Sequence, residues 1–421
     1  MIVPSIDIQG GRAVQLVGGE TLAIDAGDPA PIAERFARVG EIAVIDLDAA
    51  KGEGSNEAVI RSLCERYPCR VGGGIRSAEA AIRWLDAGAR RVILGTAARP
   101  SVLRELPRER VIAALDAKDG EIVVEGWRKT TGKPLLESIQ ELAPHVAGFL
   151  VTTVEREGRL AGADLALAEE LTKLVGDARL TLAGGVTTAD EIAQLDRLGV
   201  DAQVGMAIYN NSLPLADAFL APFQTDRADG LIPTVVSDPS GIALGLVYSS
   251  PESVAAAIDE GRGIYYSRSR GGLWRKGATS GYTQRLLRLE ADCDRDTLRA
   301  VVEQQGPFCH TGTDTCFGPR SGLRSLEATI ADRIKSDLDG SYTNRLLSDP
   351  SLLRAKLMEE AGELIESGTP QDAAWEAADV IYFALVALRA RGGSLDMVER
   401  ELDRRSMLIS RRPGNAKGAT T

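Results

Sequence analysis

The sequence predicts three consecutive domains: a (β/α)8 barrel, then a small β-rich α+β domain, then an all-α helical domain. Up to about residue 222, short β-branched runs alternate with amphipathic helical runs, a pattern that indicates βα units around a parallel sheet. Residues 325–408 instead repeat their apolar positions with a helical period. The chain of 421 residues is also too long for one ordinary domain, since domains hold about 100–200 residues.

Composition and charge exclude several classes of protein. A hydrophobic content of 44% and a charged content of 26% are typical of a globular chain, not of a disordered or fibrous one. The net charge of −11 provides no basic excess for binding a nucleic-acid backbone. We expect no membrane span and no signal segment, because no apolar run is long enough and the start lacks basic residues. The five unevenly spaced cysteines make a poor disulfide framework, so a reducing cytoplasm is expected.

We expect residues 1–222 to form the barrel. Eight βα units in about 220 residues suit a (β/α)8 barrel, whose chemistry lies at the carboxyl ends of the strands. The candidate strands start near Ile2, Ile42, Cys69, Arg91, Val111, Gly148, Arg179 and Ala202.

The barrel sequence contains an internal repeat. Two glycine-rich blocks lie 111 positions apart, and the aspartates Asp7 and Asp116 at the ends of strands 1 and 5 lie 109 apart. Each block either closes tight turns or presents backbone N–H groups to an anion, and two blocks in register favour the anion sites. The expected phosphate contacts are Gly73, Gly74, Arg76, Gly95 and Thr96 in one half, and Gly184, Gly185 and Gly205 in the other.

Two anion sites suit a substrate with a phosphate at each end. Asp7 and Asp116 would then face each other between the phosphates, and a carboxylate pair can divide acid and base roles if their pKa values differ.

Residues 5–12 read Ser-Ile-Asp-Ile-Gln-Gly-Gly-Arg. Together with both glycine turns and the Gly126-Trp127 pair, they resemble the histidine-biosynthetic phosphoribosylformimino-aminoimidazole carboxamide ribotide isomerases over essentially all of 1–222. This resemblance implies an Amadori rearrangement of an aminoaldose to an aminoketose, with Asp7 as the base. It also implies that Trp127 and Thr152 contact the substrate.

The acid of this reaction stays open between Asp116 and Glu157. The family usually has Asp-Gly after strand 6, where this chain has Glu157 and Gly158, and a carboxyl group one methylene further out changes the geometry. Gln15 also departs from the family, since many members carry Arg there.

Residues 228–319 are expected to form the β-rich domain, with strands near 234–236, 243–248 and 263–267 and a helix over 252–260. Cys293, Cys309 and Cys316 have the spacing C-x15-C-x6-C, which suits a catalytic zinc site with an open fourth position. Zinc-bound water has a pKa near 7 and can attack an electron-poor ring carbon. His310 is a candidate proton carrier, or alternatively a structural histidine.

Three aspartates surround the first of these cysteines. We expect Asp292, Asp294 and Asp296 to lie on one face of an extended strand, where they either bind Mg2+ or form a solvated acidic edge.

The motifs around these residues resemble phosphoribosyl-AMP cyclohydrolases over about 228–319. They include Asp-Cys-Asp-Arg-Asp at 292–296 and Gly-Pro-Phe-Cys-His-Thr-Gly at 306–312. The resemblance implies that zinc hydroxide opens the N1–C6 bond of the adenine ring, and that Arg268, Arg275 and Lys276 meet phosphates. Tyr282 stands where the family usually has a histidine, and a tyrosine cannot replace a proton carrier at neutral pH.

Residues 325–408 are expected to form helices over 326–338, 352–366, 373–391 and 395–405. If the second and third helices pack antiparallel, five carboxylates converge on one face and bind Mg2+, which would clamp a polyphosphate. The alternative is a solvated acidic face. The five residues are Glu359, Glu360, Glu363, Glu376 and Asp379.

The pattern E-E-x-x-E followed by E-x-x-D, with Gly-Ser-Tyr-Thr at 340–343, resembles the phosphoribosyl-ATP pyrophosphohydrolases over about 325–408. The resemblance implies release of pyrophosphate to leave phosphoribosyl-AMP, with Lys356 as a phosphate contact. The tail 411–421 is expected to be disordered.

The three resemblances predict consecutive steps, so the first hypothesis is a trifunctional histidine-biosynthesis enzyme that uses Zn2+ and Mg2+. Its partners would be small phosphoribosyl nucleotides, without nucleic acid or membrane, and a homodimer is expected by resemblance. Two alternatives stay open. One domain, with the middle one as first suspect, is degenerate and serves oligomerisation or regulation; or the barrel is a related cyclase that uses ammonia.

Overall fold

The computed structural model describes residues 1–124, 127, 129–336 and 340–410. The chain divides into two compact units, one formed by Met1–Gln305 with the residues from Met407 onward, and the other by Gly306–Ser406. We call the second one the helical unit. The domain boundaries 1–222, 228–319 and 325–408 stay predictions, and the expected disorder of 411–421 lies outside the described residues.

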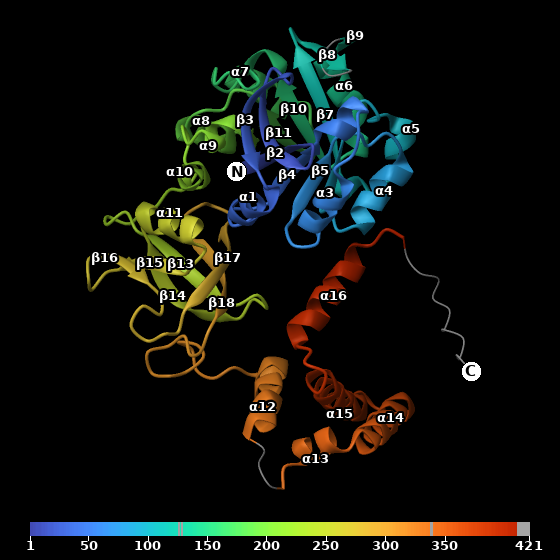
Figure 1. The fold of residues 1–421 in the computed structure, drawn as a ribbon, viewed down its shortest axis with the longest axis vertical. Coiled ribbons are helices and arrows are strands. Elements are labelled where there is room, and N and C mark those ends of the chain that lie inside the picture. The colour runs from blue at the N-terminus through green and yellow to red at the C-terminus, as the bar shows by residue number, and fades with distance from the viewer. Residues whose placement is uncertain (125–126, 128, 337–339, 411–421) are drawn as a thin grey trace. The chain divides into compact units, whose positions relative to one another are not determined.

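The first part of the larger unit is a closed parallel barrel (Figure 1). Its strands pair in the order β1-β4-β5-β6-β7-β10-β11-β12, and β12 pairs back to β1. They are β1 (Ile2–Gln9), β4 (Ile42–Asp46), β5 (Cys69–Gly72), β6 (Arg91–Leu94), β7 (Val111–Lys118), β10 (Gly148–Thr153), β11 (Arg179–Ala183) and β12 (Asp201–Val204). Each begins within one residue of its predicted start, so the barrel prediction is confirmed.

Apolar side chains fill the barrel and the space beneath the helices. Ile93, Ile112, Leu150 and Ala183 pack together inside the ring of strands. The helices of the barrel are α1 (Pro29–Phe36), α2 (Leu47–Lys51), α3 (Glu57–Cys64), α4 (Ala78–Asp86), α5 (Pro100–Leu103), α6 (Leu135–Leu142), α7 (Leu165–Thr172), α8 (Ala189–Arg197), α9 (Met206–Tyr209) and α10 (Leu215–Leu220). Short 3-10 turns occur at Arg108–Arg110, Ala143–His145 and Val154–Arg156.

Two antiparallel additions follow strands 1 and 5 of the barrel and were not predicted. They are formed by β2 (Arg12–Val17) with β3 (Thr21–Gly27), and by β8 (Glu121–Val124) with β9 (Lys129–Pro134). Every residue of β9 is exposed, so the alternation that signals a half-buried strand is absent there.

The second part of the larger unit is a six-stranded sheet, which we call the second sheet, with α11 (Pro251–Glu260). Its strand order is β16-β15-β14-β13-β18-β17, in which only the β13–β18 pair is parallel. The strands are β13 (Ile232–Ser237), β14 (Ala243–Ser249), β15 (Ile264–Ser267), β16 (Gly272–Arg275), β17 (Gln284–Ala291) and β18 (Leu298–Gln304).

The expected strand through Asp292, Asp294 and Asp296 is wrong, because β17 ends at Ala291 and these residues form the loop before β18. The Asp292 carboxylate accepts hydrogen bonds from the backbone N–H groups of Asp296 (3.1 Å) and Thr297 (3.2 Å), which closes the loop. Arg295 has a φ of 66°, outside the extended region.

The helical unit is built on one apolar cluster, formed by Ile330, Leu346, Leu353, Phe383, Leu385, Val386 and Leu395. Its helices are α12 (Gly322–Ser336), α13 (Tyr342–Ser348), α14 (Pro350–Glu366), α15 (Pro370–Arg389) and α16 (Leu395–Met407). The four predicted helices are confirmed, and α13 was missed because Asp349 and Pro350 end it within seven residues. Within the described residues, no helix combines the length and the apolar character that crossing a bilayer requires.

Candidate functional sites

A cavity of about 1210 Å³ opens at the carboxyl ends of the barrel strands. It is the place where (β/α)8 barrels carry their chemistry. All predicted catalytic and substrate-binding residues of the barrel line it: Asp7, Gly73, Gly74, Arg76, Gly95, Thr96, Asp116, Trp127, Thr152, Glu157, Gly184, Gly185 and Gly205. Gly126 of the Gly126-Trp127 pair lies outside the described residues.

Three carboxyl groups meet in this cavity, from β1, β7 and the loop after β10. Burial raises the pKa of Asp7 to about 7. Burial, followed by the negative charges of Asp7 and Asp116, raises the pKa of Glu157 to about 7. Burial also raises the pKa of Asp116, while hydrogen bonds from the side chains of Trp127 and Thr152 act in the opposite direction. The site therefore contains carboxyl groups that can hold or release a proton near neutral pH.

The β2–β3 hairpin supports Trp127 and the segment that carries Glu157. A Cβ atom added at Gly19 would lie 2.7 Å from Cζ3 of Trp127, so the indole packs directly on the hairpin turn. A Cβ atom at Gly158 would lie 2.6 Å from the carbonyl oxygen of Leu16. The backbone N–H of Gly18 also donates to the carbonyl oxygen of Glu157 (3.4 Å). The unpredicted hairpin thus positions both Trp127 and the segment that carries Glu157.

The two glycine turns have matching conformations. Gly73 and Gly184 have φ values of 91° and 93°, which favour glycine. A Cβ atom at Gly73 would lie 2.2 Å from the carbonyl oxygen of Asp46, and one at Gly184 would lie 2.7 Å from that of Thr153. Each turn leads into a helix, α4 or α8, with a side-chain N-cap. Tight packing therefore requires these glycines, and the same geometry leaves backbone N–H groups near the cavity for an anion.

Sequence reasoning missed three basic side chains that line the cavity, Lys51, Arg99 and Lys133. Arg99 follows Thr96 by three residues, so its distance from the glycine turn was a signal that could have been used. Arg76 donates to the carbonyl oxygens of Ala49 and Ala50 (3.2 Å each), which fixes its guanidinium beside the same half of the site.

Gln15 and Tyr209 are two further polar groups near the barrel mouth. Gln15 is 4% exposed, and a Cβ atom at Gly205 would lie 2.5 Å from its Oε1 atom. The Tyr209 hydroxyl is buried and has no hydrogen-bond partner among the described residues. Its pKa is raised by burial and then by the charge of Asp7.

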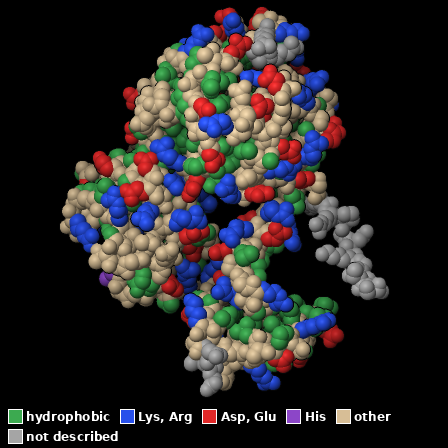
Figure 2. Space-filling model, viewed as in Figure 1, with side chains coloured by type: hydrophobic (Ala, Val, Ile, Leu, Met, Phe, Trp, Pro, Cys, Tyr) green, Lys and Arg blue, Asp and Glu red, His purple; other side chains and the backbone are tan. Residues whose placement is uncertain are grey.

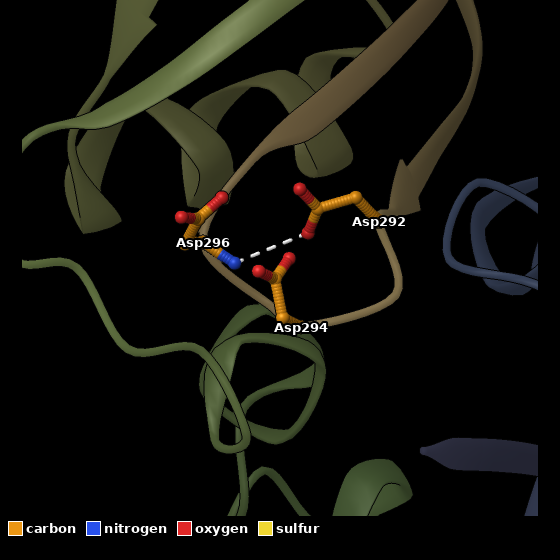
Figure 3. A group of neighbouring side chains, drawn as sticks. All are labelled: Asp292, Asp294 and Asp296. Carbon is orange, nitrogen blue, oxygen red and sulfur yellow. Dashed lines mark hydrogen bonds between the residues drawn. The ribbon is translucent and has the colours of Figure 1, made fainter.

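The loop between β17 and β18 brings together the carboxylates of Asp292, Asp294 and Asp296 (Figure 3). One ligand oxygen of each lies within 4.8 Å of the others, although the strand expected to align them is absent. Such a group of oxygens suits a hard divalent cation. Asp292 also closes the loop, so its carboxylate combines a structural contact with any ligand role.

The three cysteines expected to bind zinc are divided between the two units. Cys293 belongs to the larger unit and is exposed, whereas Cys309 and Cys316 belong to the helical unit. A hydrogen bond from the Thr311 hydroxyl (3.1 Å) is the largest of the effects that lower the pKa of Cys309 to about 6. Cys316 contributes another of these hydrogen bonds. Cys309 therefore favours the thiolate form that binds zinc. His310 is exposed, and its Nδ1 atom lies 3.8 Å from Cys309 Sγ.

The basic residues predicted to meet phosphates in the second sheet are each engaged by a protein group. Arg268 lies over the Tyr248 ring at 4.1 Å, and Lys276 over the Trp274 ring at 5.6 Å. Arg275 forms an ion pair with Glu260 (2.6 Å). Tyr282 is 41% exposed.

The acidic helices bring together three of the five predicted carboxylates. Ligand oxygens of Glu360, Glu376 and Asp379 lie within 4.8 Å of one another, across the hairpin of α14 and α15. Burial, followed by the charges of Glu363 and Glu360, raises the pKa of Glu376. These carboxylates repel one another unless a cation binds them.

The remaining two acidic residues lie outside this group. Glu363 shares a hydrogen bond with Glu376. Glu359 is exposed and pairs with Lys356 (2.9 Å), which also reaches Glu360 (3.1 Å). The lysine predicted to meet phosphate is therefore ion-paired with the acidic helix.

Three family models match the chain in succession. They are the histidine biosynthesis protein over residues 1–214, phosphoribosyl-AMP cyclohydrolase over 245–318 and phosphoribosyl-ATP pyrophosphohydrolase over 323–406. A phosphoribosyl imidazole-4-carboxamide isomerase of Methanosphaera stadtmanae is 34% identical over 232 residues, which are 98% of that protein and 52% of this chain.

Longer relatives carry the name histidine biosynthesis trifunctional protein. The one from Neurospora crassa is 41% identical over 348 residues, 82% of this chain and 38% of the relative. The one from Komagataella pastoris is 47% identical over 253 residues, 60% of this chain and 29% of the relative. The chain thus spans well under half the length of these two relatives.

Proposed function

Since this chain belongs to the histidine biosynthesis protein family, we propose that it catalyses three consecutive reactions on phosphoribosyl nucleotides. It hydrolyses phosphoribosyl-ATP to phosphoribosyl-AMP and pyrophosphate, opens the adenine ring of phosphoribosyl-AMP, and isomerises the resulting aminoaldose to the aminoketose. The observation that carries this proposal is the succession of three matched families along one chain, whose products and substrates connect.

In the barrel, Asp7 is the base that removes the C2 proton of the substrate, and Glu157 is the acid that protonates the ring oxygen. Glu157 is the better acid because burial and two neighbouring carboxylates keep its proton bound up to about pH 7. Asp116 has a pKa that burial raises, and it accepts hydrogen bonds from Trp127 and Thr152, which hold its carboxyl group in place and favour a role in orienting the substrate. The two glycine turns hold the terminal phosphates.

Enzymes of the cyclohydrolase and pyrophosphohydrolase families are metal-dependent. Here Cys309 and Cys316 would hold Zn2+, which would supply an activated water for attack on the adenine ring. The low pKa of Cys309 fits this ligand role, and His310 beside it is the candidate proton carrier. Arg268, Arg275 and Lys276 would meet phosphate when their present protein contacts are exchanged for it.

Two acidic groups would hold Mg2+: the loop of Asp292, Asp294 and Asp296, and the cluster of Glu360, Glu376 and Asp379. At the second of these groups, Mg2+ would offset the repulsion between the carboxylates and clamp the polyphosphate of phosphoribosyl-ATP. Glu359, Glu363 and Lys356 border the second cluster, where Lys356 can turn from its carboxylate partners to the substrate.

A homodimer through α14 and α15 is the proposed assembly. Met358 (67% exposed), Ile365 (84%) and Trp375 (70%) are large apolar side chains on the surface of these helices. Figure 2 shows hydrophobic side chains among the charged ones on the visible face of the helical unit. Such exposure is typical of an association surface. Light scattering that finds only monomer at assay concentration would contradict it. The five unevenly spaced cysteines make a poor disulfide framework, which agrees with the reducing cytoplasm that we propose as the location.

The test is to incubate the full chain with phosphoribosyl-ATP, Mg2+ and Zn2+ and to follow the products by chromatography. Conversion through to the aminoketose is expected. Arrest at phosphoribosyl-AMP would favour the second candidate, a degenerate middle domain, which the tyrosine at position 282 motivates. Arrest at the aminoaldose would count against the barrel assignment. Closure of a second imidazole ring when the aminoketose and ammonia are supplied directly would favour the cyclase alternative.

A further inference from the structure

Glu191, in the first turn of α8, joins two parts of the barrel site through its two carboxylate oxygens. Its Oε2 atom accepts hydrogen bonds from the backbone N–H groups of Thr187 (2.8 Å) and Thr188 (3.0 Å), and from the Thr187 hydroxyl (3.1 Å). Its Oε1 atom accepts from the backbone N–H of Ala163 (2.8 Å), in the loop that carries Glu157. One carboxylate therefore bridges the end of the second glycine turn and the loop of the proposed acid.

Direct backbone packing strengthens this bridge. The N–H of Gly162 donates to the carbonyl oxygen of Gly185 (2.9 Å), and a Cβ atom at Gly185 would lie 2.4 Å from the carbonyl oxygen of Gly162. Within the loop, Arg156 donates to the carbonyl oxygens of Gly162 (3.0 Å) and Ala161 (3.3 Å). The loop from Glu157 to Ala163 is therefore held against the glycine turn by the Glu191 bridge and by the Gly162–Gly185 contact.

The first half of the barrel lacks this bridge. The position 111 residues before Glu191 is Ala80, which has no carboxylate. There Gly74 packs directly on helix α2, since a Cβ atom at Gly74 would lie 2.6 Å from the Ala49 Cβ. The bridge is therefore not a general requirement of a glycine turn in this barrel, and it occurs in the half whose loop carries the acid.

We propose that Glu191 is a positioning residue for the isomerase reaction: it ties the loop that presents Glu157 to the phosphate turn of Gly184 and Gly185. The inference rests on the proposed isomerase function. A proton donor displaced by about 1 Å can lose on the order of 100-fold in rate, so a tie of this kind acts on the chemical step more than on substrate binding.

The test compares Glu191→Gln with Thr188→Ala in the full chain. A glutamine can direct its oxygen to the donors of the turn, but its amide nitrogen then faces the N–H of Ala163, so the tie to the loop is lost. Thr188→Ala removes the hydroxyl that caps the Glu191 N–H (3.3 Å) and leaves both oxygens of Glu191 in place. It is the matched control for a weakened helix start.

Two readouts are measured in both variants. In Glu191→Gln, hydrogen exchange of the loop peptide over 154–164 is expected to speed up about tenfold or more. The kcat of isomerisation is expected to fall about tenfold or more with KM nearly unchanged. The alkaline limb of its pH profile should move to lower pH, because water that reaches Glu157 lowers the pKa that burial had raised. In Thr188→Ala, loop exchange and the pH limb should stay as in the unmodified chain.

Two results would overturn the inference. One is a Glu191→Gln variant with unchanged loop exchange and an unchanged pH limb. The other is an equal change in both variants, which would reduce Glu191 to a helix cap. An unmodified chain without isomerase activity would instead refute the proposed function, and the exchange comparison would still decide whether the tie exists.

Discussion

Gly184 lies directly against the carboxylate of Glu157, because a Cβ atom added at Gly184 would come within 3.3 Å of the Glu157 Oε2 atom. The glycine therefore has two effects. It allows the backbone turn at a φ of 93°, and it leaves room for an acid beside the turn that is proposed to hold phosphate. In the second half of the barrel, the proposed acid Glu157 thus lies in contact with the glycine turn that is proposed to bind phosphate.

The isomerisation should have a narrow, bell-shaped pH profile centred near 7. Asp7 must be ionised to act as base, so activity falls as pH drops below its pKa of about 7. Glu157 must be protonated to act as acid, so activity falls as pH rises above its pKa of about 7. Because the groups interact, the two limbs belong to the pair. Measuring kcat/KM from about pH 5 to about pH 9 checks this, and a flat profile would contradict it.

Replacing Asp7 should stabilise the barrel in alkaline solution. The folded pKa of Asp7 is raised from 3.8 to about 7, so its contribution to stability is fully present below 3.8 and is lost as pH rises through 7. Asp7→Asn should therefore raise the free energy of unfolding by on the order of 1–4 kcal/mol near pH 8 and have little effect near pH 4. The same change should abolish isomerisation.

Thermal unfolding at both pH values measures this effect. Asp177→Asn is the control, because hydrogen bonding to Arg108 lowers the pKa of Asp177 and no alkaline gain is expected there. If Asp7→Asn is instead less stable than the unmodified chain at pH 8, then ionisation of Asp7 does not lower the free energy of unfolding of the unmodified chain.

Glu376→Gln should lower pyrophosphate release from phosphoribosyl-ATP by about 100-fold, because it removes one of the three clustered carboxylates that are proposed to bind Mg2+. Glu359→Gln is the matched control, since Glu359 lies outside the cluster and pairs with Lys356. Initial rates are measured over a series of Mg2+ concentrations. Equal losses in both variants would argue against a site built on Glu360, Glu376 and Asp379.

Cys309→Ser should remove most of the zinc that copurifies with the chain, because a serine hydroxyl does not supply the thiolate ligand. Cys64→Ser, at a buried cysteine in the barrel, should leave the zinc content unchanged. Metal analysis of the purified variants checks this prediction. Zinc that survives in Cys309→Ser would refute the proposed ligand set.

Tyr282→His should raise the rate of ring opening about tenfold or more, if the tyrosine limits proton transfer in the middle domain. The side chain is 41% exposed, so a histidine fits without repacking. Tyr282→Phe should give no increase. A rate equal in all three proteins would mean that another group, such as His310, carries the proton.

The barrel could be predicted closely because its strands are buried on both faces and read as β-branched runs bounded by glycine. The hydrophobic period also identified the long helices of the helical unit. Short or exposed elements carried no such signal. The fully exposed β9 and the seven-residue α13 were therefore missed.

The site residues were predicted from spacing, and spacing has a clear limit. It placed Asp7, Asp116 and Glu157 at one mouth because parallel strands end on the same side. It misassigned the geometry around Asp292, because alternation was interpreted as a strand while the Asp292 carboxylate closes a loop. Contacts that depend on side-chain packing, such as Trp127 on Gly19, had no sequence signal at all.

The internal repeat has a consequence for how the barrel distinguishes the two ends of its ligand. Two nearly equivalent glycine turns would accept a molecule with a phosphate at each end in either of two directions. The loops beside them are similar in length but differ in content: residues 47–51 after β4 form α2, whereas residues 154–156 after β10 form a 3-10 turn that leads to Glu157. The Glu157 carboxylate lies beside Gly184, whereas the atoms nearest to Gly73 are backbone atoms of Asp46. The two ends of the cavity are therefore chemically unequal, and a ligand with a phosphate at each end would be bound preferentially in one direction.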